Sequence, residues 1–341
     1  MPAAMRTRVA AIGVNHWHSL WDASLLRHLA GMEDVEIVGI HDDTLEIASH
    51  RAEAVGSAIP TYTDYPEMIS EVNPDFVLAL GRHDQMAGTA LYLLDIGIPF
   101  IMEKPMSYSA RQLRGVVAKA DATDGFAAVP LAQRYQPLIQ YARSLIDQDA
   151  YGPMTHFYFR MNRPSSARYP EWGSGWMLDP TVSNGGCLRN LGAHGFDAFV
   201  HLTGEREDIE VTGAQLGWTT HRQSVEDYAS VLVRSGNGVI GTIEVGNCFP
   251  REGTDSEMKV GFRDALLTLK DGHVILGTAD GESVVPDLDA HPGPGGALRM
   301  TIDAAAADGR PPIDIHDCYR AVRLIDLAYL AAGNPYRTAE V

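Results

Sequence analysis

Short apolar runs alternate with amphipathic segments along the first third of the chain. Each run has the length and the flanking turn residues that are typical of a strand buried on both faces, as in a parallel sheet. The expected strands are residues 8–14, 35–40, 59–62, 74–81, 98–102 and 126–131. Because a segment of helical periodicity follows each of the first five, the pattern predicts an α/β unit with a doubly wound parallel sheet and right-handed crossovers.

The pattern changes after Arg134. Following a helix expected at residues 135–147, the remaining apolar runs are short and strand-like, and residues 235–238 have the composition of a tight turn. The expected strands are residues 154–161, 209–218, 228–233, 238–245, 258–262 and 265–270. We therefore expect a second domain of the α+β class with an open, largely antiparallel sheet.

The boundary between the two domains is expected near the change in pattern, so that the domains span residues 5–131 and 132–341. Residues 286–296 are rich in Pro, Gly and Asp and predict an exposed loop. Residues 317–332 have the periodicity of a terminal amphipathic helix that ends at a glycine.

Charge and cysteine content exclude several classes of protein. The 27 basic and 44 acidic side chains give a net charge of -17, which disfavours binding to nucleic acid or to anionic lipid. The three cysteines, Cys187, Cys248 and Cys318, are too few and too scattered for a disulfide framework or a cysteine-ligated zinc site. No export signal and no membrane-spanning run is expected, so we expect a cytoplasmic protein.

The apolar run at residues 98–102 stops on Glu103-Lys104-Pro105. In open α/β sheets, ligands bind at the carboxyl ends of the strands, so Lys104 is placed where an ammonium group could exchange a proton with a substrate. The alternative is that Glu103 and Lys104 are ordinary solvated residues at a strand end.

The turn after the first strand decides whether this sheet can hold a dinucleotide. A standard fingerprint reads G-x-G-x-x-G, and its glycines let the backbone approach the pyrophosphate. The six positions here are Gly13-Val14-Asn15-His16-Trp17-His18, which keep only the first glycine. Asparagine tolerates the left-handed conformation, so Asn15 could preserve the turn, whereas His18 crowds it.

An acidic residue that could bind the ribose of a dinucleotide follows the second strand. Asp42 and Asp43 both stand there. A carboxylate at this position accepts the ribose hydroxyls of NAD and repels the 2′-phosphate of NADP. Asp43 could equally be a helix N-cap, so we expect Asp42 to be the ribose contact and NAD to be the cofactor.

His16 and His18 could also form an H-x-H metal site at the strand end. Both could face one ion only from an extended backbone, and a catalytic zinc needs a third protein ligand, which His41 or His83 could supply. Histidines near an anionic cofactor are adequately explained as hydrogen-bond donors to it. We therefore expect no metal.

One segment of the second domain stands out. Asn190, His194 and Asp197 are spaced so that they share one face of a helix. A polar stripe on an otherwise apolar helix is unusual for a core element, although His194 could also be a satisfied core histidine.

Four groups of residues together resemble the glucose-fructose oxidoreductase, inositol dehydrogenase and MocA (Gfo/Idh/MocA) family. They are Glu103-Lys104-Pro105, Gln133-Arg134-Tyr135, the segment Trp176 to Pro180, and Gly185-Gly186 before Asn190-x-Gly192-x-His194-x-x-Asp197. The resemblance spans the whole chain, including Arg310-Pro311-Pro312 and the last helix. It implies a Rossmann domain, a substrate and oligomerisation domain on an open sheet, and NAD(P)-dependent hydride transfer at a secondary alcohol of a sugar, sugar derivative or cyclitol.

The resemblance also implies roles for individual residues. It places the catalytic lysine at Lys104 and the catalytic histidine at His194; we expect His194 to be the general base, Lys104 a hydrogen-bond donor and proton relay, and Asn190 the residue that orients both. The expected cofactor contacts are Gly13, Asn15, His16, Trp17, His18, Asp42, Gly81, Arg82, Glu103 and Lys104. The expected substrate contacts are Arg134, Arg163, Trp172, Trp176, Asn190 and His194.

The chain departs from the family pattern at three places. The glycine fingerprint is reduced to Gly13, and Gly81-Arg82 and Met86 replace the frequent Thr-Pro and histidine. Asn190 replaces an aspartate. An asparagine can still form hydrogen bonds with a lysine or a substrate, but it carries no charge that would raise a neighbouring pKa.

Two other functions fit the same residues. Some relatives hold NAD permanently and cleave glycosidic bonds through transient oxidation; a cofactor that stays bound through purification would favour this function. A non-catalytic sugar or nucleotide sensor would bind cofactor without turnover. In each case we expect a sugar or cyclitol partner and a homo-oligomer, dimer or tetramer, formed through the C-terminal sheet.

Overall fold

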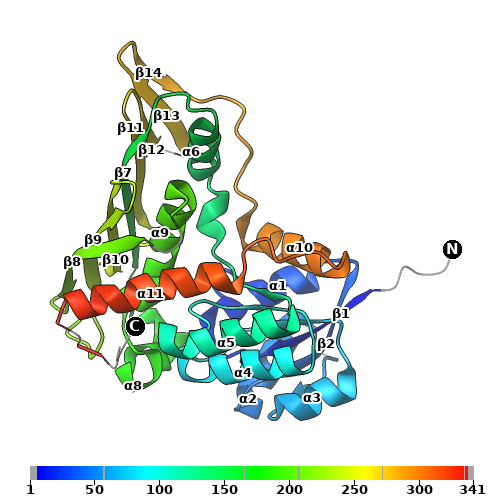
Figure 1. Cartoon of the computed structure of the whole chain (residues 1–341). Coiled ribbons are helices and arrows are strands. Elements are labelled where there is room, and N and C mark those ends of the chain that lie inside the picture. The colour runs from blue at the N-terminus through cyan, green and yellow to red at the C-terminus, as the bar shows by residue number, and fades with distance from the viewer. Residues whose placement is uncertain are drawn as a thin grey trace. The chain divides into compact units, whose positions relative to one another are not determined.

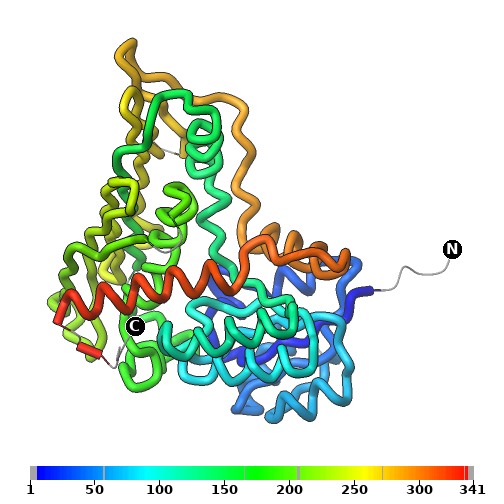
Figure 2. The backbone as a smooth tube through the Cα atoms, in the orientation of Figure 1, coloured from blue at the N-terminus to red at the C-terminus, as the bar shows by residue number. Residues whose placement is uncertain are grey.

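The computed structural model describes residues 6–56, 58–164, 166–205, 208–270, 272–333 and 335–336. The first and last residues of the two expected domains, 5 and 341, lie outside these ranges. The chain forms two compact units, and it passes from one to the other more than once, as Figure 2 traces from blue to red. The first unit comprises 1–130, 167–177 and 292–316, and the second comprises 131–166, 178–291 and 317–341. A single boundary near residue 131 therefore leaves out two segments that return to the first unit.

The first unit is built on a six-stranded sheet of order β3-β2-β1-β4-β5-β6, and all neighbouring strands in it are parallel. Its strands are β1 (Thr7–Ile12), β2 (Val35–His41), β3 (Thr61–Tyr62), β4 (Phe76–Ala79), β5 (Phe100–Met102) and β6 (Ala127–Ala128). Its helices are α1 (Leu25–Ala30), α2 (Leu45–Val55), α3 (Tyr65–Val72), α4 (His83–Asp95), α5 (Ala110–Thr123), the short α7 (Arg168–Glu171) and α10 (Gly293–Ala306). The alternation of strands and helices confirms the predicted doubly wound parallel sheet (Figure 1).

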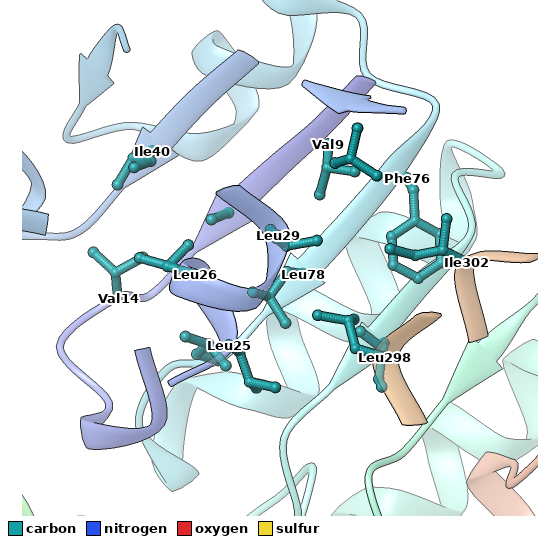
Figure 3. Close-up of a cluster of buried hydrophobic side chains, with 14 of the residues drawn as sticks. Val9, Val14, Leu25, Leu26, Leu29, Ile40, Phe76, Leu78, Leu298 and Ile302 are labelled. Carbon is teal, nitrogen blue, oxygen red and sulfur yellow. The ribbon is translucent and has the colours of Figure 1, made fainter. Parts of the chain in front are cut away.

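A cluster of buried side chains joins this sheet to its helices. Leu25, Leu26 and Leu29 of α1 belong to the same buried cluster as Val9 and Phe76 of the sheet (Figure 3). Leu298 and Ile302 of α10 complete the same cluster from far along the chain (Figure 3).

Helix α10 corrects the prediction of an exposed loop at residues 286–296, because it begins inside that stretch, at Gly293. A proline is tolerated in the first turn of a helix, and burial of Leu298 and Ile302 outweighs the poor helix propensity of the glycines.

The second unit is built on an eight-stranded sheet of order β14-β13-β12-β11-β7-β10-β9-β8. The pair β7–β10 is parallel and the other pairs are antiparallel, so the sheet is mixed and mostly antiparallel, as predicted. Its strands are β7 (Met154–Pro164), β8 (Ile209–Gly217), β9 (Tyr228–Ser235), β10 (Ile240–Phe249), β11 (Asp255–Phe262), β12 (Leu266–Lys270), β13 (His273–Thr278) and β14 (Gly281–Val284). The turn at residues 235–238 joins β9 and β10.

Strands β13 and β14 were not predicted. All four residues of β14 are exposed, so this strand lacks the alternation of buried and exposed positions on which strand prediction depends.

Helices α6 (Pro137–Asp147) and α9 (Cys187–Thr203) lie on the same side of this sheet (Figure 1). The remaining helices are α8 (Pro180–Ser183) and α11 (Ile315–Ala331). Gly195 lets α9 approach the sheet closely, since a Cβ at this position would lie 2.7 Å from side-chain atoms of both Phe159 and Ile243. The packing of α9 fixes the position of the polar residues that it carries.

Candidate active site

The carboxyl ends of β1 and β4 meet at two glycines. Gly13 has φ +68°, and a Cβ added to it would lie 2.5 Å from the Cα atom of Gly81. The Gly81 N–H donates to the Gly13 carbonyl at 2.8 Å. No other residue fits at position 13, because both the backbone conformation and the contact with β4 exclude a side chain.

A buried carboxylate, that of Asp42, stabilises the loop after Gly13 by hydrogen bonds. Asp42 is 1% exposed; its Oδ2 accepts the Asn15 N–H at 2.7 Å and its Oδ1 accepts the Thr44 N–H at 3.2 Å. Burial raises the pKa of Asp42, although these two hydrogen bonds oppose the rise. Both oxygens of the residue expected to bind ribose are thus engaged in shaping the loop.

The adjacent carboxylate, that of Asp43, lines a cavity of about 290 Å³. Its side chain is 53% exposed, and its Oδ2 accepts a hydrogen bond of 2.6 Å from the Gln85 amide. The cavity lies at the carboxyl ends of β1, β2 and β4 and the start of α4, where Gly13, Asn15, His41, Tyr65, Gly81 and Met86 also line it. Ligands of doubly wound sheets bind at this edge. Arg82, just before α4, forms a bidentate pair with Asp84.

Aromatic rings fill the turn where the fingerprint glycines usually stand. The His16 ring stacks on the buried Trp17 ring with centroids 3.9 Å apart. Tyr169 packs on Trp17 at 4.9 Å, and the Ser174 hydroxyl donates to the Asn15 carbonyl at 2.6 Å. Residues 167–177, which belong to the first unit, therefore cover this turn.

Trp172 and Trp176, expected as substrate contacts, belong to the same segment. Trp172 stacks with Trp21 at 6.0 Å, and Trp176 meets the His83 ring at 5.0 Å. The structure thus gives both tryptophans partners within the first unit.

Charged groups from two strand ends converge beside the aromatic rings. His18 Nδ1 lies 2.7 Å from Glu103 Oε1, and Glu103 is 2% exposed. Burial alone would raise the pKa of Glu103, but His18, His16 and Lys104 lower it well below its ordinary value. Burial also lowers the pKa of His16 well below its ordinary range. Lys104 is 1% exposed, and its ammonium lies 5.7 Å from the centroid of a Trp17 ring.

Helix α9 carries the polar residues of the second unit. Asn190 and Asp197 are buried and His194 is partly exposed. Arg134 forms two hydrogen bonds with Asp197, at 2.8 and 2.5 Å, and an ion pair with Asp317 at 2.7 Å. Burial alone would lower the pKa of Arg134, but the two carboxylates raise it. Arg134, expected as a substrate contact, therefore links Asp197 of α9 to Asp317 of α11.

Of the other expected contacts, Arg163 lies partly buried on β7. Lys104 belongs to the first unit, whereas Asn190 and His194 belong to the second.

Sequence reasoning missed Glu226, which closes the N-terminus of α9. Its carboxylate accepts the backbone N–H groups of Gly186 and Leu188 at 2.8 and 2.9 Å and the hydroxyls of Tyr329 and Tyr336 at 2.8 and 2.6 Å. A negative charge at this end of a helix is favourable. No local signal could have shown it, because Glu226 lies 40 residues beyond Gly186.

A parallel doubly wound sheet with a buried lysine at the end of β5, combined with an open mixed sheet, defines a dinucleotide-binding oxidoreductase of two units. The chain belongs to the GFO/IDH/MocA oxidoreductase family. Residues 7–129 match the part described as "Oxidoreductase family, NAD-binding Rossmann fold", and residues 139–262 match the GFO/IDH/MocA C-terminal domain.

Relatives of known name support the same family. Trans-1,2-dihydrobenzene-1,2-diol dehydrogenase from Sus scrofa is 25% identical over 185 residues, which cover 53% of this chain and 51% of the relative. A putative UDP-kanosamine synthase oxidoreductase subunit from Amycolatopsis mediterranei is 27% identical over 213 residues, which cover 61% of this chain and 55% of the relative. The chain spans about half the length of these relatives.

Solved structures share the whole fold. An oxidoreductase from Agrobacterium radiobacter in complex with NAD+, L-tartaric acid and magnesium is 16% identical, with a TM-score of 0.80 and 97% of each chain covered. The 3-ketoreductase KijD10 from Actinomadura kijaniata, in complex with NADP and TDP-benzene, is 18% identical with a TM-score of 0.80, covering 96% of this chain and 98% of its own. In the described part of this chain, no helix is long and apolar enough to cross a membrane.

Proposed function

We propose that this protein is an NAD-dependent dehydrogenase that transfers a hydride between nicotinamide and a secondary alcohol of a sugar, sugar derivative or cyclitol. The observation that carries the proposal is Lys104, buried at the carboxyl end of β5 in a unit that matches an NAD-binding family. Nicotinamide, when bound, supplies the hydride acceptor, and the protein has to supply a group that handles the proton.

The residues of the first unit fit a dinucleotide. Gly13 and Gly81 carry no side chains at the strand ends, and the cavity that both of them line offers a carboxylate at Asp43. The cofactor would lie across this edge, with its ribose at Asp43 and its nicotinamide toward Glu103 and Lys104. Gly81 and Arg82 would contact it from the β4 end.

The proton chemistry is proposed for three side chains. His194 acts as general base on the reacting hydroxyl, and the Lys104 ammonium donates a hydrogen bond to the reacting oxygen and relays its proton. Asn190 orients both by hydrogen bonds, since its amide can donate and accept at once. A partly exposed histidine next to a buried amide on α9 is consistent with these roles.

We expect NAD to bind more tightly than NADP, and Asp43→Asn to reduce the difference by about tenfold. The Asp43 carboxylate repels a 2′-phosphate, and one charge at short range in partly exposed surroundings is worth ~1 kcal/mol or more. Titration of both cofactors against tryptophan fluorescence measures this. The control is Glu53→Gln, which removes a charge from the exposed face of α2. Equal binding of both cofactors by the wild-type protein would exclude the assignment.

Asn190→Asp restores the charge found in the family and tests the constellation of the three catalytic side chains. An opposite charge favours the protonated forms of neighbouring bases. Both limbs of the profile of oxidation rate against pH should therefore move to higher pH, by ~1 to 3 units. An unchanged profile would mean that Asn190 is remote from the reacting groups.

The open sheet of the second unit is the proposed surface for homo-oligomerisation. Leu232, Ile240 and Leu266 are exposed on β9, β10 and β12, whereas the residues that alternate with them are buried. Exposed apolar side chains on one sheet face are typical of interfaces. Light scattering should give a dimer or tetramer for the wild-type protein, and the double variant Leu232→Arg, Ile240→Glu should be monomeric.

A further inference from the structure

Three side chains with metal-binding atoms meet at the edge of the first sheet. One ligand atom from each of His16, His18 and Glu103 lies within 4.8 Å of the others. Two of the residues follow β1 and the third follows β5. Among the described residues, this is the one group of three or more His, Cys, Asp or Glu side chains with such spacing. The sequence had suggested His41 or His83 as the third member, and the fold brings Glu103 instead.

The environment of these three side chains points to a ligand. His16 is fully buried and Glu103 nearly so. His16 Nε2 and Glu103 Oε2 are shielded from solvent and have no hydrogen-bond partner in the described part of the chain. Buried polar atoms without partners are rare and destabilising, so a species that binds both atoms would remove that cost.

We propose that His16, His18 and Glu103 bind one divalent transition-metal ion of the Zn²⁺ type. Two imidazoles and one carboxylate form a donor set that catalytic zinc sites use, with the fourth position open. Mg²⁺ and Ca²⁺ prefer oxygen ligands throughout, so the two histidines disfavour them. His16 is the extended residue just before the short 3-10 turn Trp17–Ser19, and this turn brings the centroids of the His16 and His18 rings within 4.9 Å of each other.

Metal binding would change two existing contacts. Ligand atoms of a tetrahedral zinc are roughly 3.4 Å apart, so the 2.7 Å His18–Glu103 contact would have to open. An imidazole bound through Nε2 carries its proton on Nδ1. The 3.2 Å hydrogen bond from the His18 N–H to His16 Nδ1 would therefore be lost. One long neutral hydrogen bond is worth far less than metal coordination, so this loss does not prevent binding.

The fourth position suits an anionic oxygen. Lys104 follows Glu103 directly and is buried, and its positive charge lowers the pKa of both His16 and Glu103, so it acts on the same group of side chains. A deprotonated alcohol or a carboxylate would be favoured there over a neutral ligand, because the ion and the nearby ammonium both carry positive charge.

The test is metal binding by the full-length protein, and it needs no substrate. Protein treated with a chelator should take up one Zn²⁺ or Co²⁺ per chain with micromolar or lower Kd, and the Co²⁺ form should show the visible absorption of a four-coordinate ion. His18→Gln and Glu103→Gln should each weaken binding by about 100-fold or more. The matched control is His316→Gln. It removes an exposed histidine whose Nε2 lies 3.0 Å from Asp121 Oδ1, and it should leave the affinity for Zn²⁺ and Co²⁺ unchanged.

Several outcomes would overturn the proposal. One is a folded wild-type protein that binds no Zn²⁺ or Co²⁺ below millimolar concentration, and another is unchanged affinity in both variants. His16→Ala removes a fully buried side chain, so the rise of Tm on adding Zn²⁺, measured for every variant, separates lost ligation from lost folding. Parallel NAD titrations separate this proposal from the proposed function, since metal binding without cofactor binding would refute only the latter.

Discussion

Lys104→Ala should lower turnover by roughly 100 to 10,000-fold and leave cofactor affinity nearly unchanged. The Lys104 ammonium is proposed to act on the reacting oxygen, whereas the affinity of a dinucleotide resides mainly in contacts to its adenosine and phosphates. General acid and base groups contribute to the transition state rather than to binding, so the loss should appear in kcat. Rates across a panel of sugars and cyclitols, together with fluorescence titration of NAD, measure both quantities.

The buried position of Lys104 calls for two companion variants. Lys104→Met keeps the aliphatic stem in its packed surroundings, so it should lose as much activity as Lys104→Ala with a smaller change in Tm. Lys119→Ala removes a lysine that is partly exposed and paired with Asp95, and it should keep the wild-type rate. If Lys104→Met retains more than a third of the wild-type rate with every substrate found, Lys104 is structural.

Gly186→Ala should lower the free energy of unfolding by about 3 kcal/mol or more. A Cβ at this position would lie 2.1 Å from the carbonyl oxygen of Glu226 and 2.9 Å from its backbone nitrogen. Neither atom can move aside as a flexible side chain could. The N-terminus of α9 would have to withdraw from Glu226, which would break the two hydrogen bonds that its carboxylate accepts there.

Thermal or denaturant unfolding of Gly186→Ala and Gly115→Ala provides the comparison. Gly115 lies in α5, exposed, with no atom within 4 Å of an added Cβ. Alanine there should stabilise the protein by up to about 1 kcal/mol, because it has the higher helix propensity. If the two variants had equal free energies of unfolding, the backbone at Glu226 would be able to move away from the added methyl group at little cost, and the prediction would be wrong. Since α9 carries Asn190 and His194, Gly186→Ala should also impair turnover.

Local periodicity predicted the fold to a large extent. Apolar runs bounded by turns located the parallel strands of the first unit, and the change of pattern after Arg134 located a second sheet. The same patterns missed α10 as a helix, because glycine and proline dominate its first turn while its buried face is defined only by α1 and the sheet.

Candidate residues at strand ends and on α9 could be chosen from the sequence because spacing determines which residues share an edge or a face. Gly13, Glu103 and Lys104 follow strands, and Asn190 and His194 lie four residues apart on one helix. Which of two neighbouring carboxylates would line the cavity at the strand ends could not be predicted in this way. Asp42 and Asp43 have the same side chain, and only the fold gives them different burial and different hydrogen-bond partners.

The sequence by itself therefore determined the two sheets and the strand ends at which chemistry is expected, since both follow from interactions between residues close in the chain. Tertiary structure alone decided the partners. Arg134 meets Asp197 from 63 residues away, and His18 meets Glu103 from 85 residues away. Such pairs depend on which surfaces the folded core brings together, and the periodicity of a short segment carries no information about partners so far away in the sequence.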